Sequence, residues 1–207
     1  FMYGWFEYVD FEGTEIRQMI DALLRNDVSV DPTLVIFEGM VRGDDPWYTE
    51  NPALELAAPS LVRNWRDWFN FNTGWTPEDF AAAKKAWPRF LEFTRLLHEA
   101  GVVLTAGTDA NNPWIVPGHS FHRELELLVE AGIPELEVLK IATHNGAEVS
   151  GMLDVTGTIE VGKSADLVLL TDSPLASISN SRKIEWVMQA GRVYLPESLL
   201  AGLRKER

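Results

Sequence analysis

The feature that most constrains the fold is a long helix followed at once by a short apolar strand that stops at a polar turn. Thr76-Pro77-Glu78-Asp79 combines a capping residue, a proline in the first turn and early acids, a pattern typical of a helix start. We predict that this helix runs to about Ala100 and that Gly101 ends it. Residues 102–106 then form an apolar strand, which stops at Gly107-Thr108-Asp109. This order of elements predicts an α/β fold.

The chain before this unit is predicted to contain one helix, one strand and a long excursion. Apolar residues recur at helical spacing over residues 14–26 and indicate a helix. Residues 28–37 are rich in β-branched side chains and favour a strand that starts or restarts at Thr33. Residues 38–75 have no sustained period, which indicates a long excursion with one short helix over about 61–69.

Tryptophans gather in this excursion, at positions 47, 65, 68 and 75. They could line a substrate pocket, or they could pack the loop against its own domain, as large aromatic side chains more often do. We assign them no catalytic role.

The later part of the chain changes from helices to strands. Two helices are predicted over residues 121–131 and 134–143, and a third short helix ends near Gly151. Three short strands are predicted over residues 157–160, 165–170 and 185–194. Ala190-Gly191 is the predicted tip of a hairpin within the last of these ranges.

Composition excludes several classes of protein. Hydrophobic residues make up 46% of the 207 residues, enough to form a sizeable core. The net charge of -13 leaves too few Lys and Arg for a phosphate-binding stripe, so we expect no nucleic-acid partner. We expect no membrane partner, because no apolar run approaches the roughly 20 residues that span a bilayer. The chain has no cysteine, so any metal must be held by His and carboxylate ligands. The first residues do not form a signal peptide, and we predict no localisation.

Asp109 is the first candidate for a catalytic residue. In barrels of parallel strands and helices, reactive groups lie at the C-terminal ends of the strands, and Asp109 occupies such a position. A carboxylate there could bind a divalent ion and accept a proton from the attacking water. It could equally cap its own turn together with Asn111.

Two histidines, His119 and His122, begin the helix after this turn and are spaced to lie on one face. With Asp109 they could make a three-ligand zinc set, although a histidine pair at a helix start more often caps the helix or contacts solvent. Structural roles are the better reading for the remaining candidates, His98, His144 with Asn145, Lys163 and Asp166.

Several ordered motifs resemble the amidohydrolase superfamily, and most closely its prolidase and imidazolonepropionase-like branch. The motifs are residues 105–110 (TAGTDA), 117–125 (PGHSFHREL), 142–147 (ATHNGA), 157–168 (GTIEVGKSADLV) and 191–194 (GRVY). Residues 31–34 (DPTL) also resemble the family's penultimate barrel strand. The order of the motifs is far more specific than any one of them.

The resemblance implies a fold, a reaction and a role for two residues. It implies the C-terminal portion of a TIM-like (β/α)8 barrel over residues 1–152 and strands of a small β-sandwich domain over residues 153–207. Asp109 matches the aspartate that ends the eighth barrel strand, which is both a catalytic residue and a metal ligand. His122 matches a histidine that contacts substrate. The implied cofactor is a divalent metal, one or two zinc ions, and the implied reaction is hydrolysis of an amide or other C–N bond in a dipeptide, acyl amino acid or cyclic amide.

The sequence also departs from the family pattern. We find no His-x-His pair, no lysine or equivalent acid of the fourth strand, and no histidines of the fifth and sixth strands; Phe1 falls at or just beyond the place of the sixth-strand histidine. We therefore expect that the first six strands come from a missing N-terminal portion or a second chain. The alternative is a truncated, non-catalytic fragment that binds no metal and folds by self-association, as a homo-oligomer, or with a partner chain.

Overall fold

The computed structural model describes residues 2–205, so Phe1 lies outside the described part. The chain divides into two compact units, Phe1–Ile133 and Pro134–Arg207, each of which is described by itself. The boundary predicted after residue 152 stays a prediction. None of the helices in the described range is long and apolar enough to cross a membrane.

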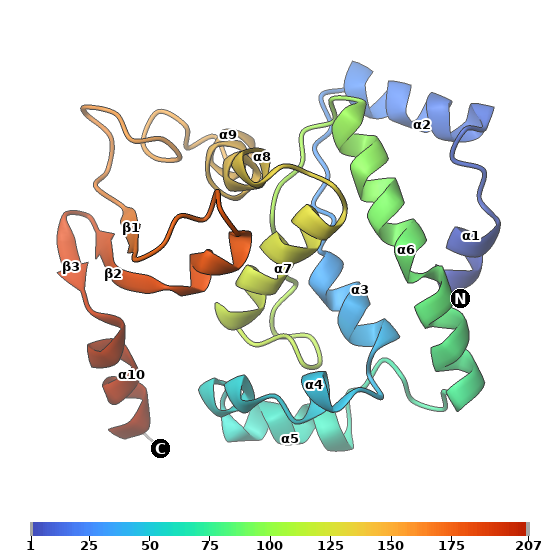
Figure 1. Ribbon diagram of the computed structural model, residues 1–207, viewed down its shortest axis with the longest axis horizontal. Helices are drawn as coiled ribbons and strands as arrows, with labels where there is room; N and C mark the ends of the chain where they lie inside the picture. Colours follow the sequence, from blue (N-terminus) through green and yellow to red (C-terminus); the bar gives the residue numbers. More distant parts are fainter. Residues whose placement is uncertain (1, 206–207) are drawn as a thin grey trace. The chain divides into compact units, whose positions relative to one another are not determined.

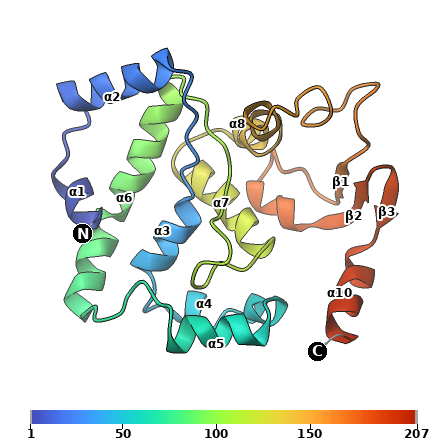
Figure 2. The same ribbon diagram turned by 180° about the vertical axis from the view of Figure 1, so that it is seen from behind.

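The first unit is built around a long helix, α6 (Pro77–Glu99), which contacts α1 (Met2–Tyr8), α3 (Leu34–Val41) and α7 (His119–Glu130). In Figures 1 and 2, α3 lies between α6 and α7. The prediction for α6 is confirmed, because Thr76 and Asp79 form a reciprocal capping box. The helix predicted over residues 14–26 is confirmed as α2 (Thr14–Arg25).

The strand predicted over residues 28–37 is wrong for most of its length. Only Val30 pairs, through a parallel bridge to Leu104, and residues 34–41 form helix α3. The strand predicted over residues 102–106 is likewise reduced to Leu104, the one residue of that range that pairs. The amide groups of Leu34 and Val35 at the start of α3 both donate to the buried carboxylate of Glu124, with N···O distances of 3.0 and 2.7 Å. This cap comes from a residue about ninety positions away, so nothing in the local sequence announces the helix.

The excursion between α3 and α6 is more helical than predicted. It contains α4 (Pro46–Thr49), a 3-10 turn η1 (Pro52–Leu56) and α5 (Pro59–Asp67). These elements share a small apolar cluster with the segment before α7, made of Tyr48, Leu54, Ala57, Trp65, Trp114 and Val116. Trp65 therefore packs the excursion against its own unit, as expected, whereas Trp47 and Trp68 are exposed.

The second unit begins with helices. The segment predicted to be helical over residues 134–143 forms α8 (Glu135–Lys140), and a π-helical turn η2 (Ile141–Asn145) and α9 (Gly146–Val149) follow it.

A three-stranded antiparallel sheet of order β1-β2-β3 follows, formed by β1 (Leu167–Leu170), β2 (Ile184–Gln189) and β3 (Arg192–Tyr194). The hairpin tip is confirmed, since Ala190 and Gly191 join β2 to β3 with φ of 49° and 80°. The strand predicted over residues 157–160 is wrong, because that segment is irregular. A 3-10 turn η3 (Ile178–Arg182) precedes β2, and α10 (Pro196–Lys205) follows β3.

Candidate active site

Two chain segments lie parallel where the candidate site begins. Val30 and Leu104 form the bridge, and around them the Val30 amide donates to the Val103 carbonyl (2.9 Å) and the Thr105 amide donates to the Val30 carbonyl (3.0 Å). Because the two segments run parallel, their C-terminal ends lie on the same side of the bridge. The residues that follow them therefore share one edge of the pair.

Asp31 and Gly107 close this edge. The Gly107 amide donates to the Asp31 carboxylate at 2.8 Å, and a Cβ atom at position 107 would lie 2.3 Å from the other carboxylate oxygen. Only glycine allows so close an approach without a shift of the neighbouring chain. Sequence reasoning assigned Asp31 no role in the site.

Asp109 stands in the turn that follows, exposed, in the left-handed region with φ of 48°. Its backbone carbonyl accepts hydrogen bonds from the amide and the side chain of Asn112, at 3.1 and 2.8 Å. Its carboxylate makes no hydrogen bond or ion pair with any residue between 2 and 205. The turn is thus closed by the Asp109 backbone and Asn112, and the carboxylate stays available for another ligand.

His119 and His122 occupy the first turn of α7, and both are half-buried. The three-ligand zinc set of Asp109, His119 and His122 is wrong: within the described residues no three His, Asp or Glu side chains are grouped closely enough to hold a metal ion. Asp109 can supply one ligand, and a complete metal site needs others from outside these residues.

Glu124 is a third carboxyl group near this edge, after Asp31 and Asp109, and it is fully buried on α7. Burial raises its pKa to about 8, while the two amide hydrogen bonds from α3 act in the opposite direction and the charges of Asp31 and Glu38 add to the rise. The group links α7 to the start of α3, the helix that follows the Val30 segment. Its signal in the sequence was an acid among the leucines of an amphipathic helix.

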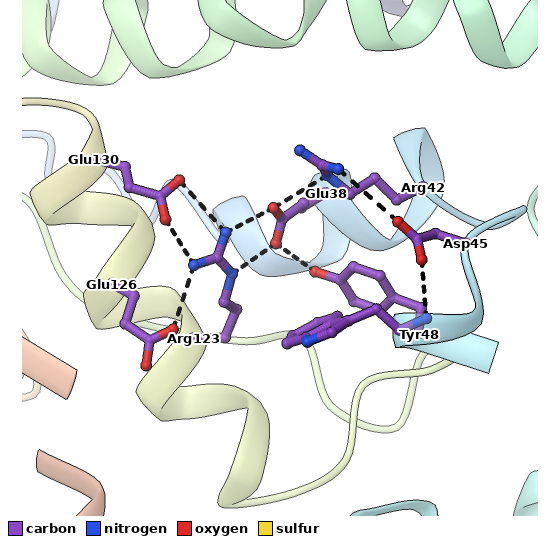
Figure 3. Close-up of polar contacts among 8 residues, drawn as sticks. Glu38, Arg42, Asp45, Tyr48, Arg123, Glu126 and Glu130 are labelled. Atoms are coloured by element: carbon purple, nitrogen blue, oxygen red, sulfur yellow. Dashed lines mark hydrogen bonds and ion pairs between the residues drawn. The ribbon is translucent and has the colours of Figure 1, made fainter. Parts of the chain in front are cut away.

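An ionic network joins α3, α4 and α7 (Figure 3). The guanidinium of Arg123 donates to both oxygens of the buried Glu38 carboxylate at 2.9 and 2.8 Å, and the Tyr48 hydroxyl donates to the same carboxylate at 2.5 Å. Arg123 also pairs with Glu130 at 2.7 Å.

The network shifts the pKa values of Arg123 and Tyr48. Burial lowers the pKa of Arg123, but its bonds to Glu38 and Glu130 outweigh that effect and raise it. Burial and the Glu38 charge raise the pKa of Tyr48. Arg123 therefore stays charged and Tyr48 stays neutral around neutral pH. A lone acid in the apolar run LVIFEGMV was the sequence signal for Glu38.

The remaining candidates have local contacts. Asp166 accepts hydrogen bonds from the Ala190 amide and the Ser164 hydroxyl, both at 2.7 Å, and these bonds lower its pKa. This carboxylate therefore fastens the start of β1 to the hairpin, which confirms a structural role. His144 lies in the π-helical turn with its ring 3.3 Å from the Asn145 amide oxygen.

Comparison with known proteins gives one family and one curated relative. A sequence profile described as the Amidohydrolase family matches residues 88–194, about half of the chain. The imidazolonepropionase of Shouchella clausii (strain KSM-K16) is 34% identical over 111 residues, which cover 51% of this chain and 24% of that protein.

Solved structures of amidohydrolases and prolidases resemble the chain. A bottromycin amidohydrolase aligns with a TM-score of 0.66 and 28% identity, covering 82% of this chain and 37% of that one. A putative prolidase from Bifidobacterium longum aligns with a TM-score of 0.52 and 32% identity over 65% of this chain and 34% of that one. A Xaa-Pro dipeptidase with bound methionine, 23% identical, shares the fold over 86% of this chain and 37% of its own, with a TM-score of 0.58. The chain thus spans well under half of each relative.

Proposed function

Because this chain belongs to the amidohydrolase family, we propose that it forms the last part of a barrel enzyme that hydrolyses an amide or other C–N bond of a small molecule. The names of its relatives, an imidazolonepropionase, a putative prolidase and a bottromycin amidohydrolase, support this class of bond. A dipeptide, an acyl amino acid or a cyclic amide are the substrates that the proposal covers.

One observation carries the proposal: the exposed carboxylate of Asp109, without a partner among the described residues, follows a segment that is bridged in parallel to the Val30 segment. Every other acid at this edge is engaged, Asp31 with the Gly107 amide and Glu124 with the start of α3. A carboxylate at the C-terminal end of a barrel strand is where this fold places its chemistry.

The carboxylate oxygens of Asp109 can occupy one ligand position of a divalent metal ion, and we propose that this ion is zinc. When bound, one or two such ions would polarise the scissile carbonyl and acidify a nearby water. The other ligands would come from barrel strands outside these 207 residues, since the described residues contain no group of three.

The residues of this chain would then act on protons and on the substrate. Asp109 would accept the proton that the attacking water loses as its oxygen bonds to the carbonyl carbon. The same carboxyl group would return that proton to the nitrogen as the C–N bond breaks. We propose His122, half-buried on α7, as a contact to the substrate.

The proposed whole is a TIM-like (β/α)8 barrel, of which residues 1–152 form the C-terminal portion, with a β-sandwich that includes residues 153–207. The Val30 and Leu104 segments would be its last two strands, and the small sheet of β1, β2 and β3 would belong to the sandwich. The barrel's other strands would come from further polypeptide, in the same chain or in a partner.

The second candidate is a non-catalytic fragment that folds as a homo-oligomer or on a partner chain. It is favoured by the described strand pair, which is joined by a single bridge and leaves backbone groups for another strand to bind. Oligomeric mass measured by light scattering separates the two candidates, together with hydrolytic activity.

The test is hydrolysis by a polypeptide that joins these residues to the completing barrel strands, assayed on Xaa-Pro dipeptides, acyl amino acids and cyclic amides. We expect Asp109→Asn to lower kcat by about 100-fold or more, the usual worth of a general acid-base group. The matched control is Asp27→Asn. Like Asp109, Asp27 is exposed and has positive φ (50°), but it lies at the N-terminal end of the Val30 segment, away from the candidate site. Equal kcat values for the two variants would refute the role of Asp109.

A further inference from the structure

A tryptophan from the excursion reaches the turn that carries Asp109. Trp65 lies on α5 with no exposed surface, and its indole N–H donates to the backbone carbonyl of Asn111 at 3.1 Å. The two residues are 46 positions apart in the sequence. Asn111 is only two residues beyond Asp109, so this bond fixes the chain close to the proposed catalytic group.

The rest of the turn is held mainly by its own atoms. Asn112 bonds back to the Asp109 carbonyl, and the Ile115 amide bonds back to the Asn112 carbonyl at 3.0 Å. Within the described range, the Trp65 indole makes the one hydrogen bond that reaches residues 108–115 from outside the turn. The anchors on either side are the Asp31–Gly107 bond and the bond from the Val116 amide to the Ser120 hydroxyl.

The turn needs such an anchor because of its backbone. Asp109 and Trp114 both have positive φ, 48° and 69°, a region that costs a non-glycine residue free energy unless its surroundings impose it. Asp109, Ala110 and Asn111 are exposed, so packing alone does not hold them. Trp65 instead packs near Trp114, with ring centroids 6.2 Å apart, and adds the directed bond to Asn111.

We propose that Trp65 is a positioning residue for Asp109, and that the helical excursion fixes the turn at the mouth of the barrel. This role rests on the proposed function of Asp109. If Asp109 is catalytic, its position matters, because a displacement of about 1 Å at a catalytic group can lower the rate 100-fold. The indole N–H positions the turn through its hydrogen bond to the Asn111 carbonyl.

The first test measures hydrogen exchange by NMR in this chain, at the Asn112 amide, whose bond to the Asp109 carbonyl closes the turn. Two variants remove the bond: Trp65→Phe, and replacement of Trp65 by 3-benzothienylalanine, which keeps a bicyclic ring and lacks the N–H. The control is Leu54→Ala, which removes apolar volume from the same cluster without touching Asn111.

We expect both Trp65 variants to speed exchange at Asn112 by about tenfold or more while amides in α6 keep their rates, and the control to leave Asn112 within about threefold. Unchanged exchange at Asn112 in the benzothienyl variant would overturn the proposal, even if Trp65→Phe fails to fold. So would equal effects of Leu54→Ala and the Trp65 variants.

The second test uses the hydrolytic activity of the completed barrel. The benzothienyl variant should lower kcat by about tenfold or more with KM within about twofold, because the substrate contacts remain and the position of Asp109 is lost. An unchanged kcat would overturn the positioning role. Failure of the proposed function looks different: Asp109→Asn would then keep full activity while the exchange effect at Asn112 persists.

Discussion

Glu124 makes the stability of this protein depend on pH in a defined direction. The carboxyl group is fully buried, and its two oxygens accept hydrogen bonds from the amides of Leu34 and Val35 at 3.0 and 2.7 Å. Burial raises its pKa to about 8 despite those two bonds, and the charges of Asp31 and Glu38 contribute to the rise. In the folded protein the group therefore keeps its proton at pH values where the unfolded chain has lost it.

The magnitude follows from linkage. The folded state binds more protons than the unfolded state between pH 4.5 and about 8, so the free energy of unfolding falls as pH rises through that window. The stabilisation from Glu124 is complete below pH 4.5 and is lost above about pH 8. The difference between the two pKa values corresponds to roughly 5 kcal/mol in total.

Glu124→Gln is the perturbation that isolates this effect. Glutamine is neutral at every pH and has one oxygen and one NH₂ group, so one of the two α3 amides loses its acceptor at a cost of about 1–3 kcal/mol. We expect the variant to be the less stable protein at about pH 5.5. Between about pH 5.5 and pH 9 it should lose several kcal/mol less than the parent chain, so that the two stability curves converge or cross.

Urea unfolding at about pH 5.5, 7 and 9 measures both curves. Tryptophan fluorescence reports mainly on the first unit, because seven of the eight tryptophans lie in residues 1–133. The general repulsion that accompanies a net charge of -13 acts on both proteins nearly equally and cancels in the comparison. Parallel curves, with a constant gap between parent and variant at all three pH values, would refute the reasoning.

Three further predictions concern stability, all measured by urea unfolding. Arg123→Ala leaves Glu38 buried without its bidentate partner and should cost about 3–5 kcal/mol, whereas Arg95→Ala, which breaks an exposed pair, should cost at most about 1 kcal/mol; similar losses would contradict the network. Tyr48→Phe removes one donor to Glu38 and should cost about 1–3 kcal/mol, and a neutral effect would mean that the bond contributes nothing. Thr76→Ala removes the capping box of α6 and should cost about 1 kcal/mol, seen also as fraying of the first turn in hydrogen exchange; an unaltered first turn would contradict it.

Elements with local signals were predictable from the sequence. Helix α6 starts at a capping box that the letters TPED display, and the hairpin of β2 and β3 turns at Ala190-Gly191, where the backbone has positive φ. Each signal lies within a few residues of the element that it specifies. The extended segment before Asp109 could be predicted from its own apolar residues, but it pairs only at Leu104, and its partner Val30 lies far away in the sequence.

Features that depend on distant residues were not predictable. Helix α3 was taken for a strand because its cap is Glu124, which lies on another helix. Trp65 received no role, because only the fold brings its indole to Asn111. The histidine pair at the start of α7 suggested a zinc set that the fold does not assemble with Asp109. The spacing of residues along the sequence did not reveal which of them the fold brings together.

Metal content most directly tests the central claim, that Asp109 supplies one ligand to a site whose other ligands lie outside these 207 residues. The measurement is zinc per polypeptide, by mass spectrometry after dialysis, for these 207 residues alone, for the completed barrel and for its Asp109→Asn variant. The account predicts well under about 0.1 ion for the chain alone, at least about one ion for the completed barrel, and a clear loss in the variant. Stoichiometric zinc in the chain alone, or equal zinc in the completed barrel with and without Asp109, would contradict it.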